Sequence, residues 1–241
     1  MEDIITDIKV IEQAEDLKKM ISIQSLTFSY PSGEFRLDIE KLSVASGDKV
    51  AFVGPSGSGK TTLLNLVAGI LPPQKGSIKV DNDEINSLGD SSRRNFRITN
   101  IGFIFQDFGL LDYLDVRDNI LHPYRITDAL KLNSDIRGRA DMLAEQMGIA
   151  DKLQRHPSDL SHGERQRVAI CRALLPEPKL ILADEATGNL DPNNKAHILE
   201  LLFQSVEDHG ATLLAVTHDH ELLPHFDNVI NFSDFLQGET T

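Results

Sequence analysis

The chain has 241 residues, which is enough for one large α/β domain, or for a domain with a smaller lobe. Its 24 basic and 37 acidic residues give a formal net charge of −13, which argues against the binding of nucleic-acid phosphates as the main function. One cysteine, Cys171, excludes an internal disulfide and is typical of a reducing compartment. No stretch approaches the ~20 apolar residues of a membrane-spanning helix, and the acidic start lacks the pattern of a signal peptide. We therefore expect a soluble, cytoplasmic protein, with Cys171 as a small buried residue on a helix.

Strands are predicted in the first third of the chain. Residues 1–20 are charged and weakly patterned, and we expect them to form a frayed or loosely helical extension. Apolar and polar residues alternate over 21–30 and 35–39, which predicts two strands joined by a turn at Pro31-Ser32-Gly33. A short hairpin is expected over 76–83.

The rest of the chain predicts an α/β fold. The pattern turns helical between about 107 and 160, with helices near 115–122 and 134–147. After these, continuous apolar runs at 179–183 and 211–216 predict strands that are covered on both faces. Such strands are typical of a parallel sheet.

A phosphate-binding pattern lies at residues 54–61, which read Gly-Pro-Ser-Gly-Ser-Gly-Lys-Thr and fit G-x-x-x-x-G-K-[ST]. An apolar strand is expected at 50–53 and a helix at 62–68. Glycines let the backbone N–H groups of such a loop converge on phosphate oxygens, and the helix start adds a positive dipole end. Lys60 would reach the β- and γ-phosphates, and the Thr61 hydroxyl would ligate Mg²⁺. An ordinary glycine-rich turn is the alternative interpretation. The residues predicted to bind a nucleoside triphosphate here are Gly54, Pro55, Ser56, Gly57, Ser58, Gly59, Lys60, Thr61 and Thr62.

Two carboxylates, Asp184 and Glu185, end a predicted apolar strand. Open α/β sheets bind ligands at the carboxyl ends of their strands, so Asp184 would hold Mg²⁺ there. Glu185 points in a different direction and would polarise a water for in-line attack on the γ-phosphate. Taken alone, the two acids could also be the start of a helix.

Another helix is predicted to begin at Ser161 and Gly163. Its first N–H groups and its dipole end suit an anion, although a plain capped helix start explains the same residues. Two further motifs follow, Gly188-Asn189-Leu190-Asp191 and Val216-Thr217-His218-Asp219.

In this order, the motifs resemble those of the nucleotide-binding subunit of ATP-binding-cassette (ABC) transporters, over about residues 21–232. The resemblance implies a P-loop NTPase fold of the RecA type, with a mainly parallel sheet, an antiparallel β subdomain and an α-helical subdomain at about 107–165. It implies one domain over 21–236, followed by a tail at 237–241.

The resemblance also implies roles for single residues. Asp184 matches the Mg²⁺ aspartate of the family, Glu185 its catalytic glutamate and His218 its switch histidine. Gln106 matches the glutamine loop, which implies that it takes part in catalysis and ligates Mg²⁺. Tyr30 lies where the family stacks an aromatic ring on adenine.

The remaining motifs are implied to contact the nucleotide of a second chain. The signature segment, residues 160–164, supplies Ser161, Gly163 and Glu164, and the loop that joins the two subunits supplies Asp191. Two chains would thus sandwich two ATP molecules head to tail.

Three details are similar to the LolD/MacB/FtsE-type branch, which serves lipoprotein release, macrolide export and cell division. They are the run 102–108, Glu164 and the run 183–191. The branch implies a separately encoded integral-membrane permease that holds the protein peripherally at the inner face of the cytoplasmic membrane. The implied work is export or extraction of a lipoprotein, lipid, peptide or drug-like cargo, with no nucleic acid as partner.

The chain departs from the family at three positions. His162 stands in place of the first signature glycine, Arg165 in place of a glutamine, and Ala186 in place of the proline of the branch. The Ser and the second Gly of the signature are kept, so we expect function to survive, with His162 weakening or tuning the sandwich.

Other functions stay open at this stage. An ATP-gated regulator that signals through a membrane partner without transport is one, and a nucleic-acid-associated cassette protein is another. A metal site made of His218, Asp219, His220 and His225 is a further alternative for the motif around His218.

The apolar stretch 103–113 either packs the joint between the core and the helical lobe or forms a groove for a permease helix.

Overall fold

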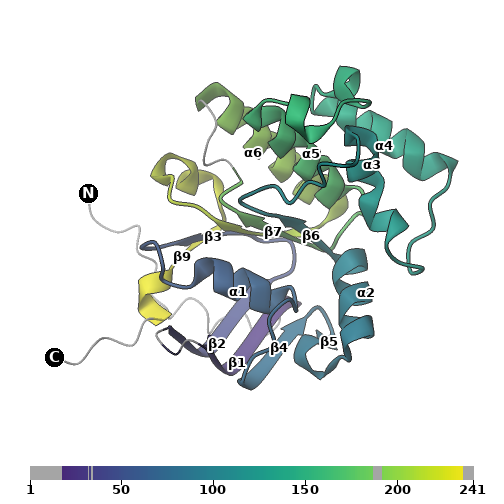
Figure 1. Ribbon diagram of the computed structural model, residues 1–241. Coiled ribbons are helices and arrows are strands. Elements are labelled where there is room, and N and C mark those ends of the chain that lie inside the picture. Colours follow the sequence, from purple (N-terminus) through teal and green to yellow (C-terminus); the bar gives the residue numbers. More distant parts are fainter. Residues whose placement is uncertain (1–17, 32, 34, 187–191, 236–241) are drawn as a thin grey trace.

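The computed structural model describes residues 18–31, 33, 35–186 and 192–235, and Figure 1 shows how its elements are arranged. Most of the predicted extension, Asp191 with its neighbours, and the tail at 237–241 lie outside the described residues. Among those that are described, no helix combines the length and the apolar character needed to cross a membrane.

A five-stranded sheet in the order β6-β7-β8-β3-β9 forms the centre of the fold, and all of its strand pairs are parallel. The prediction of a parallel sheet is therefore confirmed. The middle strands are almost completely buried, which explains their continuous apolar sequences. The strands are β3 (Lys49–Val53), β6 (Ile101–Ile104), β7 (Leu180–Asp184), β8 (Thr212–Val216) and β9 (Asn228–Asn231).

A second sheet is antiparallel and has the order β2-β1-β4-β5. It consists of β1 (Lys19–Ser29), β2 (Arg36–Ala45), β4 (Lys75–Val80) and β5 (Asp83–Glu84). The hairpin expected over 76–83 is confirmed as the pair β4–β5. Strand β1 begins at Lys19, inside the segment that the sequence assigned to an extension, because Lys19 pairs with Ala45 of β2.

Helix α1 (Lys60–Val67) lies between the two sheets and contacts β4 and β7 (Figure 1). Its apolar side chains at Leu63, Leu64, Leu66 and Val67 are fully buried, in one core with the antiparallel sheet. The sheets therefore hold the start of this helix from both sides.

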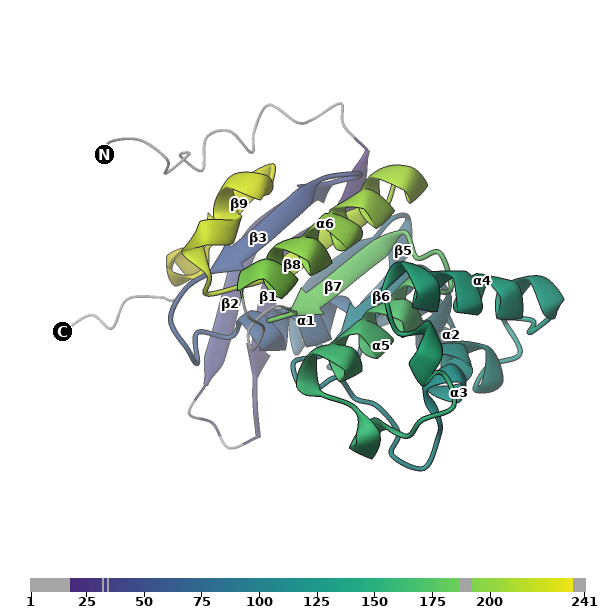
Figure 2. The same cartoon turned by 90° about the horizontal axis from the view of Figure 1, so that it is seen from above.

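The other helices gather around the opposite face of the parallel sheet and beside it. Figure 2 shows α5 and α6 next to one another above the strands. Cys171 of α5 is buried as predicted, and burial raises the pKa of its thiol to about 12. These helices are α3 (Val116–Leu121), α4 (Ser134–Gln146), α5 (His162–Leu174) and α6 (Pro192–His209).

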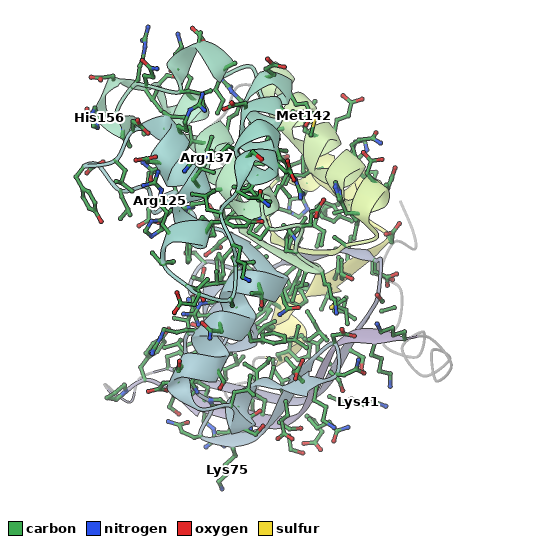
Figure 3. The ribbon with its side chains drawn as sticks, turned by 90° about the vertical axis from the view of Figure 1, so that its right-hand side faces the viewer. Lys41, Lys75, Arg125, Arg137, Met142 and His156 are labelled. Carbon is green, nitrogen blue, oxygen red and sulfur yellow. The ribbon has the colours of Figure 1, made fainter. Side chains whose placement is uncertain are left out.

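Helix α2 (Asp90–Asn100) and strand β6 have no counterpart in the sequence prediction. Short 3-10 helices complete the chain: η2 (Ile85–Ser87), η3 (His122–Arg125), η4 (Ala150–Lys152), η5 (Pro157–Asp159), η6 (His220–His225) and η7 (Phe232–Phe235). In Figure 3, Arg125, Arg137, Met142 and His156 lie on the helical lobe, at the end of the molecule away from Lys41 and Lys75 of the antiparallel sheet.

The fully buried Asn119 of α3 holds the loop that precedes this helix. Its Oδ1 accepts a hydrogen bond from the N–H of Leu111, at 2.8 Å. Its Nδ2 donates to the carbonyls of Leu111, Leu114 and Asp115 at 3.0–3.1 Å. One side chain therefore fixes the path of residues 111–115.

Replacing Asn119 by alanine should lower the free energy of unfolding by about 1–3 kcal/mol, because buried backbone groups lose their partner. Urea denaturation measures the change. Asn82→Ala is the matched control, since Asn82 is exposed and makes a single hydrogen bond to Asp81, and it should change the free energy by less than about 0.5 kcal/mol. Equal effects of the two substitutions would contradict the anchoring role.

Candidate nucleotide-binding site

The loop between β3 and α1 has a backbone that only glycine adopts easily. Gly54 has φ +149° and Gly59, the residue before α1, has φ +102°. A Cβ on Gly59 would lie 2.5 Å from Cζ of Phe35, and one on Gly54 would lie 3.1 Å from Cβ of Phe232. Both the backbone and the close packing therefore require glycine at these two positions.

Lys60 is the first residue of α1, and its side chain folds back into this loop. Its Nζ donates to the carbonyls of Gly54 and Pro55 at 2.9 and 2.7 Å, and to Oγ of Ser58 at 3.3 Å. Burial lowers the pKa of Lys60, and the carboxylates of Glu185 and Asp184 oppose that shift. The loop thus surrounds an ammonium group at the point where phosphate oxygens would meet backbone N–H groups.

Asp184, at the end of β7, is a buried carboxylate with one oxygen that accepts no hydrogen bond. It is 3% exposed, and its Oδ1 has no hydrogen-bond partner. Burial raises the pKa of Asp184, and a hydrogen bond from Thr61 opposes the shift. A buried carboxylate oxygen without a partner, next to a hydroxyl, is a donor set that fits a hard cation such as Mg²⁺.

Glu185 follows with a strained backbone, at φ +49°. Its N–H donates to the carbonyl of Val216 at 3.1 Å, which ties it to the end of β8. Its Oε1 lies 3.3 Å from Nδ1 of His218, and its Oε2 accepts from Nε2 of Gln106 at 3.5 Å.

The three predicted catalytic side chains therefore meet at one edge of the parallel sheet. Gln106 follows β6, Glu185 follows β7 and His218 follows β8. These strands are neighbours and run in the same direction, so their carboxyl ends bring the three residues together. A carboxylate flanked by an amide and an imidazole can accept a proton from water and keep that water oriented.

Tyr30 lies beside the start of α1. Its hydroxyl is 3.1 Å from Oγ1 of Thr62, and its ring faces those of Phe28 and Phe35 at 4.9 and 5.8 Å between centroids. Phe35 was not predicted as part of the site, although it is the side chain that lies on Gly59. Its aromatic ring at the start of the predicted strand 35–39 was the available signal.

The signature segment opens α5, as predicted. Ser161 and Glu164 form a capping box, in which the Ser161 N–H donates to Oε2 of Glu164 at 2.7 Å and the Glu164 N–H donates to Oγ of Ser161 at 3.3 Å. These hydrogen bonds lower the pKa of Glu164. The structure therefore gives Glu164 a role within its own helix.

The chain does not bring the signature segment and the phosphate loop together on one face. Figure 1 shows α1, with Lys60, on one side of the parallel sheet and α5, with Gly163 in its first turn, on the other side. Asp191, the last predicted contact to nucleotide, lies outside the described residues.

The alternative metal site near His218 is not supported. Asp219 pairs with Lys195 at 2.8 Å, and the His225 ring faces Phe203. Throughout the described part of the chain, no three or more His, Cys, Asp or Glu side chains are grouped so that they could hold a metal ion.

Comparison with known proteins decides the family. The sequence profile of a family described as ABC transporter matches residues 37–188. This chain belongs to the ABC transporter family. A lipoprotein-releasing system ATP-binding protein, LolD of Geobacter metallireducens, is 38% identical over 221 residues, which are 90% of this chain and 97% of LolD. The macrolide export ATP-binding/permease protein MacB of Rhodopirellula baltica is 39% identical over 223 residues, which are 91% of this chain and 33% of MacB.

Solved structures agree with the sequence relatives. A structure described as a dimeric, post-hydrolysis state of the ATP-binding cassette MJ0796 bound to ADP and Pi superposes with a TM-score of 0.80 at 32% identity, and covers 88% of this chain and 94% of that one. The predicted P-loop NTPase fold and the predicted binding and hydrolysis of ATP are confirmed. The chain is the ATP-hydrolysing subunit of an ABC transporter, and it spans one third of the length of the MacB relative.

Proposed function

We propose that the chain works as a head-to-tail homodimer that closes around two ATP molecules. The observation that carries this proposal is the separation of α1 and α5 by the parallel sheet, which leaves the signature segment free to face the nucleotide of another copy (Figure 1). The cassette MJ0796, described as dimeric and bound to ADP and Pi, supports the same arrangement. The interface would be two-fold and self-complementary.

In this dimer the phosphate loop, residues 54–62, holds the nucleotide through its backbone N–H groups, and Lys60 contacts the β- and γ-phosphates. Tyr30 contacts the adenine. Ser161, Gly163 and Glu164 in the signature segment, together with Asp191, complete the site from the partner chain.

Asp184, Thr61 and Gln106 would hold Mg²⁺, and the unpartnered Oδ1 of Asp184 supports this assignment. When bound, Mg²⁺ neutralises the charge that develops on the phosphate oxygens as the γ-phosphoryl group leaves. Glu185 accepts the proton of the attacking water, while Gln106 and His218 keep that carboxylate and water aligned.

We infer that the subunit drives an integral-membrane permease encoded separately, at the inner face of the cytoplasmic membrane. The LolD and MacB relatives are named for lipoprotein release and macrolide export, and they favour a cargo of lipoprotein, lipid, peptide or drug-like character. Hydrolysis would open the dimer and move the permease.

Tyr113 is our candidate for the contact with the permease. Its side chain is 76% exposed, in the loop that Asn119 anchors and only seven residues beyond Gln106. By contrast, Phe103 and Phe108 are buried. Part of the stretch 103–113 therefore packs within the protein, and Tyr113 is available to a partner.

Replacing Tyr113 by glutamate should leave ATP hydrolysis by the isolated chain within about twofold, because an exposed side chain contributes little to folding. The extra hydrolysis that the permease stimulates should fall at least about tenfold, since a charge would enter an apolar contact. Both rates are measured with and without the co-purified permease in lipid vesicles. Met142→Glu, an exposed apolar residue on α4 (Figure 3), is the control. Loss of both activities with Tyr113→Glu would favour a packing role.

An ATP-gated regulator that signals without transport is the second candidate, favoured by the similarity to the cell-division type of the same branch. Vesicles that contain the co-purified permease separate the two functions. Movement of cargo together with ATP hydrolysis supports the transporter, and hydrolysis coupled to the permease without movement of cargo supports the regulator.

A further inference from the structure

The segment that carries Gln106, residues 105–109, has an unusual backbone. Phe108 has φ +65°, a conformation that bulky residues rarely adopt, and Gly109 has φ +54°. The N–H of Phe108 donates to the carbonyl of Phe105 at 3.0 Å, which closes a tight turn around Gln106 and Asp107. Strain of this kind persists only where surrounding contacts hold it.

Helix α5 holds one end of this turn at two points. The ring of His162 meets the ring of Phe108 edge to face, with 4.6 Å between centroids and 73° between planes. The guanidinium of Arg172 donates to the carbonyls of Phe108 and Gly109. Burial lowers the pKa of Arg172 to about 10, so the group stays charged at neutral pH. Long side chains on a helix lean toward its N-terminus, and this direction lets Arg172 reach the same turn that His162 contacts.

The parallel sheet holds the other end. The ring of Phe105 stacks on that of Phe103 in β6, with 4.1 Å between centroids and 11° between planes. Gln106 therefore lies between an anchor on the sheet and an anchor on α5, and its Nε2 is 3.5 Å from Oε2 of Glu185. A change at either anchor would move the amide relative to the carboxylate.

We propose that His162 is a positioning residue for Gln106: its ring, through Phe108, sets the distance between Gln106 and Glu185. His162 lies between Ser161 and Gly163 in the signature segment. If that segment contacts the partner's nucleotide, which rests on the proposed function, then His162 links the nucleotide of the other site to the catalytic pair of its own chain. The histidine is thus a coupling element where the family usually has glycine.

A double-mutant cycle on the full chain tests the link. His162→Ala should lower kcat for ATP hydrolysis by about threefold to tenfold, the size expected from one ring contact. In a Gln106→Ala background the same substitution should change kcat by less than about twofold, because the residue through which it acts is gone. An unchanged factor in both backgrounds would overturn the proposal.

Two further variants separate positioning from charge and from folding. His162→Phe keeps an aromatic edge against Phe108 and should retain kcat. His162→Asn has no ring and should lower kcat as His162→Ala does. A low kcat of His162→Phe would also overturn the proposal. His156→Ala is the matched control, an exposed histidine on the same lobe (Figure 3). Should His162→Ala fail to fold, Phe108→Ala enters the same cycle with the same expectation.

The proposed dimer is tested by a separate measurement. Light scattering of Glu185→Gln, with His162 unchanged, shows whether ATP doubles the mass. A monomer in that experiment would show that ATP alone does not close the dimer of the isolated chain, and a non-additive cycle beside it would still support the positioning of Gln106 by His162.

Discussion

Replacing Glu185 by glutamine should lower kcat for ATP hydrolysis by at least about 10²-fold, while ATP still binds. The amide has the shape of the carboxylate but cannot accept the proton of the attacking water. The contacts to Gln106 and His218 place this side chain at the carboxyl edge of the sheet, beside Asp184. The phosphate loop is unchanged by the substitution, so nucleotide affinity should stay within about twofold.

The same variant should accumulate as an ATP-bound dimer, because hydrolysis no longer opens the sandwich. Light scattering with and without Mg-ATP measures the doubling of mass. Glu221→Gln is the matched control, since Glu221 is exposed and only three residues beyond His218. Turnover within about tenfold of the unmodified chain would contradict the assignment of Glu185 as the base. A variant that stays monomeric would mean that the permease must hold the two copies together, or that His162 prevents closure, and His162→Gly in the same variant separates these causes.

The strands and the main helices could be predicted because their signals are local. Leu180–Asp184 and Thr212–Val216 are apolar throughout, so their burial on both faces was readable. Helix α2 has only two apolar residues, Phe96 and Ile98, and their spacing of two positions does not form the apolar stripe that predicts a helix. Strand β6 is four residues long, and Gly102 is needed there because a Cβ would lie 2.5 Å from the carbonyl of Ala173 in α5. That requirement exists only once the helix has packed on the sheet.

The candidate site also has residues that the sequence predicts and contacts that only the folded structure shows. Asp184 and Glu185 were predicted from their place after an apolar run, and the parallel sheet brings Gln106 and His218 to the same edge. Glu185 has a left-handed backbone, and its N–H donates to the carbonyl of Val216, which is distant in sequence. The contacts of His162 and Arg172 with the turn around Gln106 also join distant segments. A sequence shows which residues carry chemistry, whereas the strained turn that positions them depends on tertiary contacts.

Replacing Lys60 by alanine should weaken ATP binding by about 10²-fold, because roughly two charge-assisted hydrogen bonds to phosphate oxygens are lost. Titration calorimetry with Mg-ATP measures the affinity. Lys60 also holds the carbonyls of Gly54 and Pro55, so the substitution removes contacts within the loop, and thermal unfolding of the variant without nucleotide records that separate effect. Lys75→Ala, an exposed lysine on the antiparallel sheet (Figure 3), removes the same charge far from the loop and should leave the affinity unchanged. If Lys60→Ala bound ATP as tightly as Lys75→Ala, residues 54–61 would not be the phosphate site. A loss of affinity without a matching loss of thermal stability would assign the effect to the phosphate contacts themselves, because the loop would then still be folded around the missing ammonium group.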